Sequence, residues 1–319
     1  KPSLSIGFVG FAGGDVHLEL AVMLAGLLVG LVVGLTGMGG GALMTPILVL
    51  LFRINPLSAV SSDIVAAVVM KPVGGSVHFR RGTVNVNLVR WLALGSVPAA
   101  FCGVLVLRAI GAPEFGDRLK VLLGAVLLVA AGAIVAKGVL QARRPSGGGV
   151  HAITVRPGRT VLIGVIGGLV VGMTSVGSGS VMIVLLMLLY PALSSNELVG
   201  TDLVQAIPLV AAAAIGHLFF GDLQFGLTLS LVIGSVPGVY LGARVSSRAP
   251  DRIIRPLLVV VLTVSALALL GVPNAVILAI LGGAGLGALV TYAWRRATND
   301  TWGELTRDTY DERCRDASV

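Results

Sequence analysis

Long apolar segments that are almost free of charge constrain this chain more than any other feature of its sequence. Most are long enough to cross about 30 Å of hydrocarbon as helices, and they lack the alternation of a membrane barrel. Two are only ten residues long, Ala42–Leu51 and Ser180–Leu189, which favours short or re-entrant helices. The pattern predicts an all-α polytopic membrane protein. The eleven segments are Val16–Thr36, Ala42–Leu51, Ala59–Phe79, Leu88–Arg108, Leu119–Val139, Val161–Thr174, Ser180–Leu189, Leu198–Phe220, Leu227–Arg244, Ile253–Leu270 and Ala275–Trp294.

The low charge content excludes an ordinary soluble domain. Charged residues make up 12% of the chain and its mean hydropathy is +0.97, whereas soluble domains average about 25% charged residues. Such high hydrophobicity also excludes disorder. The net charge of +8 lies in loops between the apolar segments. This distribution is typical of the positive-inside rule and not of a nucleic-acid surface, so we expect a lipid bilayer and no nucleic acid as partner.

The chain contains an internal repeat. Several short motifs of the first half recur in the same order in the second half, and chance could produce one such match but not the whole ordered series. The sequence therefore predicts two halves of five helical segments, the second of each short or re-entrant, followed by one extra C-terminal helix. The matches recur at an offset of 138 to 139 residues: Val33–Gly41 with Val171–Gly179, Asp63 with Asp202, His78 with His217, and Gly95–Pro98 with the identical Gly234–Pro237.

Loop charges predict that the two halves are inverted relative to one another. The linker Gln141–Thr160 holds four arginines and no acid, which favours a cytoplasmic position. Arg80 and Arg81 follow His78, whereas Asp222 stands in the equivalent loop. We therefore expect the N-terminus outside and the C-terminus in the cytoplasm. The predicted organisation is repeat 1 at 16–140, a basic linker at 141–160, repeat 2 at 161–271, an extra transmembrane helix at 275–294 and a cytoplasmic tail at 295–319.

Two glycine-rich breaks between apolar segments form the main candidate site. Glycine exposes backbone N–H groups, and a helix that begins after such a break directs the positive end of its dipole toward it. Two such breaks in inverted halves can hold an anion at the membrane midplane. The alternative is tight helix packing through small residues. The candidate binding residues are Thr36, Gly37, Gly39, Gly40 and Gly41 in the first break, and Ser175, Gly177, Ser178, Gly179 and Ser180 in the second.

Ionisable residues inside the apolar segments are candidates for coupling or gating. Asp63 and Asp202 either couple a proton or cation, or anchor the glycine breaks; the alternative is a carboxylate near a helix N-terminus at the interface. Lys71, eight residues after Asp63, is too far along a regular helix for a direct ion pair. It either attracts anions or snorkels to the interface. His78 and His217 are further candidates, although interfacial positions or hydrogen-bonded structural roles are favoured for both.

The motifs of membrane-associated enzymes and metal sites are missing. No His-Glu-x-x-His pair suits zinc, and Ser178 follows Val176-Gly177 where an intramembrane serine protease requires Gly-x-Ser-Gly. The two cysteines, Cys102 and Cys314, are too far apart to form a metal motif. The sequence therefore predicts no enzyme, no catalytic residues, no metal and no cofactor.

Taken as a set, these motifs resemble the sulfite exporter TauE/SafE family from about Val16 to Leu270. The first half carries Gly37–Gly41 with Pro46, then Asn55–Asp63, His78 and Gly82–Val84, and the second half carries Thr174–Ser180, Glu197–Asp202, Gly216–His217 and Gly234–Gly238. Val184 occupies the position equivalent to Pro46, and serines occupy some of the positions that are glycine in the first break.

The resemblance implies a bacterial or archaeal inner-membrane permease for small sulfur-containing anions, such as sulfite or organosulfonates, that works by secondary transport. With the residues above, it indicates alternating access around an anion site between the two breaks. The alternatives are a passive anion channel and a membrane assembly or sensor protein that does not transport. The sequence does not specify the substrate, the direction, the coupling ion or the oligomeric state.

Overall fold

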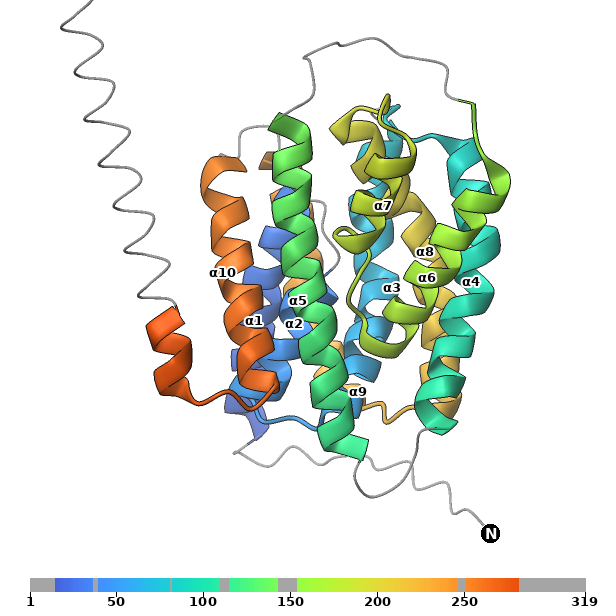
Figure 1. Ribbon diagram of the computed structural model, residues 1–319. Coiled ribbons are helices and arrows are strands. Elements are labelled where there is room, and N and C mark those ends of the chain that lie inside the picture. The colour runs from blue at the N-terminus through green and yellow to red at the C-terminus, as the bar shows by residue number, and fades with distance from the viewer. Residues whose placement is uncertain are drawn as a thin grey trace, which may run out of the picture. The chain divides into compact units, whose positions relative to one another are not determined.

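The computed structural model describes residues 15–36, 40–80, 82–109, 115–142, 154–245 and 251–280, which are helical with connecting turns and contain no β-strand (Figure 1). Residues 1–271 form one compact unit and residues 272–319 another, of which residues 274–280 are described and helical. The elements are α1 (Asp15–Thr36), α2 (Gly41–Pro46), η1 (Ile47–Leu51), α3 (Pro56–Arg80), α4 (Val86–Ala109), α5 (Phe115–Ala142), α6 (Pro157–Thr174), α7 (Val181–Leu189), α8 (Ser195–Phe220), α9 (Phe225–Val245) and α10 (Asp251–Leu269).

Seven of the described helices are long and apolar enough to cross a membrane, which confirms the predicted all-α polytopic membrane fold. Their apolar faces suit a lipid surrounding: Leu20, Leu24 and Leu28, four residues apart along α1, are each more than half exposed. The seven spans are Glu19–Thr36, Pro56–Arg80, Val86–Ala109, Gly116–Leu140, Pro157–Thr174, Glu197–Phe220 and Phe225–Val245, and Pro256–Leu269 is a shorter apolar stretch.

The second segment of each half is short, as expected from its length in the sequence. Ala42–Leu51 folds as α2 and the π-helical turn η1, which meet at Pro46. Because proline has no amide to donate, it interrupts the regular ladder, and the backbone continues with a wider turn. In the second half, α7 is an uninterrupted α-helix of nine residues. Most of the predicted helix 275–294 and all of the tail 295–319 lie outside the described residues.

Two pairs of helices from opposite halves pack closely through small residues. Figure 1 shows α4 beside α6, and α1 lies in the same way along α9. A Cβ atom added to Gly30 of α1 would collide with the backbone of Ser235, and one added to Gly168 of α6 would collide with the backbone of Ser96. Gly30 is equivalent to Gly168, and Ser235 to Ser96, so the same contact occurs twice. Such close backbone approach is the main source of helix attraction in a membrane.

The third helices of the two halves, α3 and α8, pack antiparallel. Ser61 near the start of α3 contacts His217 near the end of α8, whereas Gly75 lies against Leu203 and Ile207 near the start of α8. The loops that follow these helices make matching hydrogen bonds. The backbone amide of Asn85 donates to Thr201 Oγ1 over 3.0 Å, and the backbone amide of the equivalent Gln224 donates to Ser62 Oγ over 3.4 Å.

Candidate functional site

The two breaks predicted from the sequence meet in the interior. A Cβ atom added to Gly41, the first residue of α2, would collide with the backbone carbonyl of Ser175, which ends α6. Gly40 is also buried, and its added Cβ would lie 3.3 Å from the Met70 side chain. Gly37 and Gly39 lie outside the described residues. Among the candidates that are described, residues of both halves therefore come into direct backbone contact.

The second break is a compact turn built on left-handed backbone. Ser175 has φ 61°, and the two glycines that follow have φ 127° at Gly177 and 85° at Gly179. Side chains are strained in this region, so glycine suits both positions. The Thr174 hydroxyl donates to the Val170 carbonyl over 2.6 Å and accepts the Val176 amide over 3.2 Å. The turn presents Ser178 between the glycines and places Ser180 at the N-cap of α7.

Thr36 in the first break behaves like its counterpart Thr174. Its hydroxyl donates to the Val32 carbonyl, one turn earlier in α1, over 2.8 Å. The structure thus uses both threonines to end the first helix of each half, an arrangement in which a hydroxyl bonds the carbonyl four residues back.

Asp63 joins α3 to α2 and to the second break. Its side chain is buried, and Thr45 of α2 donates its hydroxyl to Oδ2 over 3.0 Å. The Ser175 hydroxyl of the second break faces the same carboxylate. Asp63 lies seven residues into α3, so it is an internal group and not a carboxylate at the helix terminus. Its contacts suit an anchor for the breaks.

Lys71 is a buried cation, with 7% of its surface exposed, and this burial does not fit the alternative of a lysine that snorkels to the interface. Its Nζ donates to Ser178 Oγ over 2.6 Å, across from the first half to the second. Lys71 interacts electrostatically with both Asp63 and Asp202 but forms no direct ion pair with either of these two described residues. A buried ammonium is costly without anionic partners, and here two carboxylates and a hydroxyl compensate it.

Asp202 is buried like Asp63 but has different neighbours. The backbone amide of Gly179 and the side chain of Gln205 face its carboxylate. Its Oδ1 atom, Gln205 Nε2 and Ser180 Oγ are buried and make no hydrogen bond within the described part of the chain. Sequence reasoning missed Gln205. The available signal was a polar residue three positions after Asp202 in an apolar helix, where the first half has Ala66.

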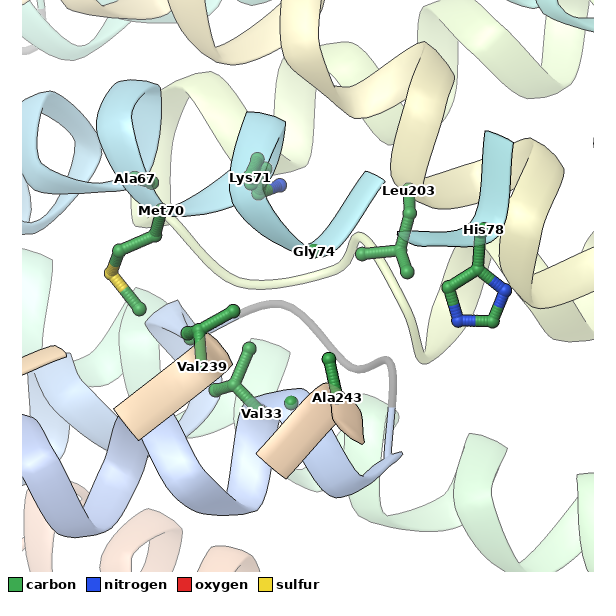
Figure 2. Close-up of a pocket in the computed structure, with 11 residues that line it drawn as sticks. Val33, Ala67, Met70, Lys71, Gly74, His78, Leu203, Val239 and Ala243 are labelled. Carbon is green, nitrogen blue, oxygen red and sulfur yellow. The ribbon is translucent and has the colours of Figure 1, made fainter. Parts of the chain in front are cut away.

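A small pocket lies next to this cluster (Figure 2). Figure 2 shows Lys71 and His78 on one helix, with Val33, Val239 and Ala243 on helices across the pocket. Its lining is mostly apolar with few polar groups, a composition that small-molecule sites share. The lining residues are Val33, Gly34, Gly40, Ala67, Met70, Lys71, Gly74, His78, Leu203, Val239 and Ala243.

The two equivalent histidines lie in different surroundings. His217 is buried, with Nδ1 2.9 Å from Ser61 Oγ and Nε2 2.9 Å from the Gly172 carbonyl oxygen. It therefore holds α8 against α3 and α6. His78 borders the pocket, and its Nδ1 lies 3.2 Å from Thr83 Oγ1. The structure does not bring His217 into the pocket with Lys71.

No cluster of three or more histidine, cysteine, aspartate or glutamate side chains suited to a metal ion occurs among the described residues. The chemistry that the cluster offers is therefore polar recognition by hydroxyl, amide, ammonium and carboxylate groups, at the meeting point of two helix breaks.

Comparisons with known proteins agree on a membrane transporter. The model of the family "Sulfite exporter TauE/SafE" matches residues 22–269. The "Probable membrane transporter protein YjnA" of Bacillus subtilis (strain 168) is 36% identical over 258 residues, which cover 79% of this chain and 100% of that protein. The "Probable membrane transporter protein YdhB" of the same organism is 25% identical over 69% of this chain and 86% of its own length. No solved structure matches this chain.

Proposed function

Since this chain belongs to the sulfite exporter TauE/SafE family, we propose that it is a secondary transporter, a permease for small sulfur-containing anions such as sulfite or organosulfonates. The observation that carries the proposal is the meeting of the two helix breaks inside an apolar bundle, beside a buried lysine. Anions bind where unsatisfied backbone amides and a cation converge. The proposal assigns no chemical conversion to the protein.

The substrate site in this proposal lies between Lys71 and the second break. Ser178 is the present partner of the ammonium, and an oxyanion can replace the hydroxyl and accept a stronger, charge-assisted hydrogen bond. The pocket that Lys71 borders gives a small solute access to this point. The breaks supply donors from both halves, in keeping with a site at the repeat interface.

Inversion of the two halves completes the mechanism. Its support is the antiparallel packing of the equivalent helices α3 and α8, together with contacts that recur when equivalent helices are exchanged. A two-fold axis that relates antiparallel helices lies across them, which places it in the membrane plane. Rocking of one half against the other would then expose the site to each side in turn.

The orientation follows from the basic loops. With the N-terminus outside and the C-terminus cytoplasmic, Arg80 and Arg81 lie on the cytoplasmic side. The pocket borders α3 from Ala67 to His78, in the half of the helix that ends at Arg80, so the described conformation faces the cytoplasm in this orientation. The membrane is the bacterial or archaeal inner membrane.

The coupling step is assigned to the buried aspartates. A proton or cation that neutralises a buried carboxylate lowers the cost of its negative charge beside an incoming anion. Asp202 suits this role because one of its oxygens has no partner among the described residues, whereas Asp63 is engaged with the Thr45 hydroxyl.

Flux measurements in proteoliposomes test the proposal. Liposomes that contain the purified protein should accumulate sulfite or methanesulfonate, and an imposed proton gradient should change the rate of uptake. Protein-free liposomes should not accumulate either anion. Flux that ignores every gradient and is far faster than a carrier cycle would indicate a passive anion channel. If no oxyanion crosses the membrane under any gradient, the chain is not an anion permease. In that case, loss of the protein's activity in cells on deletion of residues 295–319 would favour an assembly or sensor protein.

A further inference from the structure

Gln205 is a buried polar residue whose hydrogen bonds are incomplete. It is fully buried on α8, and its Oε1 accepts the Ser96 hydroxyl of α4 over 3.0 Å. Its Nε2 makes no hydrogen bond within the described residues, although the side chain faces the Asp202 carboxylate on the same helix. Leaving a buried donor unsatisfied is costly, and folded proteins rarely keep such a group without a reason. An incoming ligand with an acceptor atom would supply the missing bond.

Further polar atoms without a partner lie at the start of α7 and on α8, near Gln205. Ser180, at the N-cap of α7, has a buried hydroxyl with no partner in the described part of the chain. The Oδ1 atom of Asp202, one turn before Gln205 on α8, is an acceptor that also lacks a partner there. Lys71 reaches the same break at Ser178. The Gly179 amide of this turn and the Gln205 side chain both face the Asp202 carboxylate, so Lys71 and two donors without a partner lie around the turn together with one acidic group. This combination suits an anion with more than one acceptor oxygen.

The first half does not repeat this cluster. Ala66 stands at the position equivalent to Gln205, and Ala42 at the position equivalent to Ser180. Ser235, the counterpart of Ser96, accordingly has a buried hydroxyl with no partner among the described residues. The bond between Ser96 and Gln205 is therefore specific to the second half. This asymmetry fits a role in recognition.

We propose that Gln205 is a substrate-selecting residue: its amide nitrogen and the Ser180 hydroxyl donate hydrogen bonds to oxygens of the anion beside Lys71, and Ser96 fixes the amide. This inference rests on the proposed anion transport and assigns the selectivity to the second half. Directional donors favour a sulfite or sulfonate group, which carries several acceptor oxygens, over a spherical halide.

Transport kinetics of matched variants test this role. Gln205→Glu keeps the size of the side chain and an acceptor for Ser96 but replaces the donor, and Gln205→Leu removes both polar atoms. We expect the KM for sulfite to rise about 10-fold or more in each, since a bond to a charged partner is lost, while the maximal rate changes by less than about 3-fold. Inhibition of sulfite uptake by chloride should become stronger relative to wild type. Ser180→Ala should raise the KM less.

Ser235→Ala is the matched control, because it removes a buried hydroxyl that also has no partner among the described residues and does not line the pocket, and it should leave the KM unchanged. If Gln205→Leu does not purify as a monodisperse protein, Gln205→Glu and Ser180→Ala decide the question. Wild-type protein that carries no oxyanion overturns the proposed function itself. Wild-type transport with an unchanged KM and chloride inhibition in Gln205→Glu and Ser180→Ala overturns only the role of Gln205 and Ser180.

Discussion

The two buried aspartates occupy equivalent positions in the repeat, yet their surroundings differ. Asp63 is engaged by the Thr45 hydroxyl and faced by Ser175, whereas Asp202 has an oxygen without a partner among the described residues. The difference follows from the sequence of each half, because Ile183 stands where Thr45 has its counterpart. Equivalent acids in a repeat can therefore diverge when the hydroxyl beside one of them is replaced by an apolar side chain beside the other.

The contact between the breaks lies beside Asp63, whose carboxylate the Ser175 hydroxyl faces, and Gly41→Ala is the change that should break this contact. The added Cβ would collide with the Ser175 carbonyl, and backbone on both sides leaves little room for adjustment. We expect loss of nearly all transport, or of the folded protein, measured by uptake in proteoliposomes and by size-exclusion chromatography. Gly132→Ala is the control, since nothing lies within 4 Å of its added Cβ, and it should behave as wild type. Normal transport by Gly41→Ala would show that the breaks do not meet as described.

Lys71 is the cation that both aspartates share, and Lys71→Met would remove it while keeping a long side chain. A charge-assisted hydrogen bond contributes about 1.5–3 kcal/mol, so we expect the KM for sulfite to rise about 10- to 100-fold. The control is Lys120→Met, which removes an exposed lysine paired with Asp117 over 2.9 Å; surface pairs contribute little. Equal KM values in wild type and Lys71→Met would remove the lysine from the substrate site.

The aspartates themselves give the next test. Asp202→Asn fixes the group in a neutral form, so gradient-driven accumulation of sulfite should fall about 10-fold while exchange of sulfite for sulfite stays within about 2-fold of wild type. Asp63→Asn should instead lower accumulation and exchange alike, because it weakens the anchor that Thr45 supports. Identical behaviour of the two variants would contradict the division of roles. Paired accumulation and counterflow assays on the same liposomes make this comparison.

The sequence predicted the helices and the pairing of residues better than it predicted their contacts. Apolar runs and the repeat were enough to align Asp63 with Asp202 and to expect two breaks, because these patterns are local or recur at a fixed offset. The bond between Lys71 and Ser178 joins residues 107 positions apart. It depends on how α3 packs against the second break, which no local pattern encodes. Gln205 escaped notice because one glutamine in an apolar helix carries no motif.

The smallest expected effect comes from making the first aspartate more like the second. Thr45→Val keeps the shape of the side chain but removes the hydroxyl that donates to Asp63 Oδ2 over 3.0 Å. A net hydrogen bond contributes about 0.5–1.5 kcal/mol, so we expect a modest fall in thermal stability in detergent and a fall in exchange rate of about 2-fold to 5-fold, with gradient dependence retained. The informative result is that transport still depends on the gradient, because a coupling role for Asp63 would change this gradient dependence. Thr45→Ser, which keeps the hydroxyl, should restore both properties, and a loss of gradient dependence in Thr45→Val would place coupling in the first half.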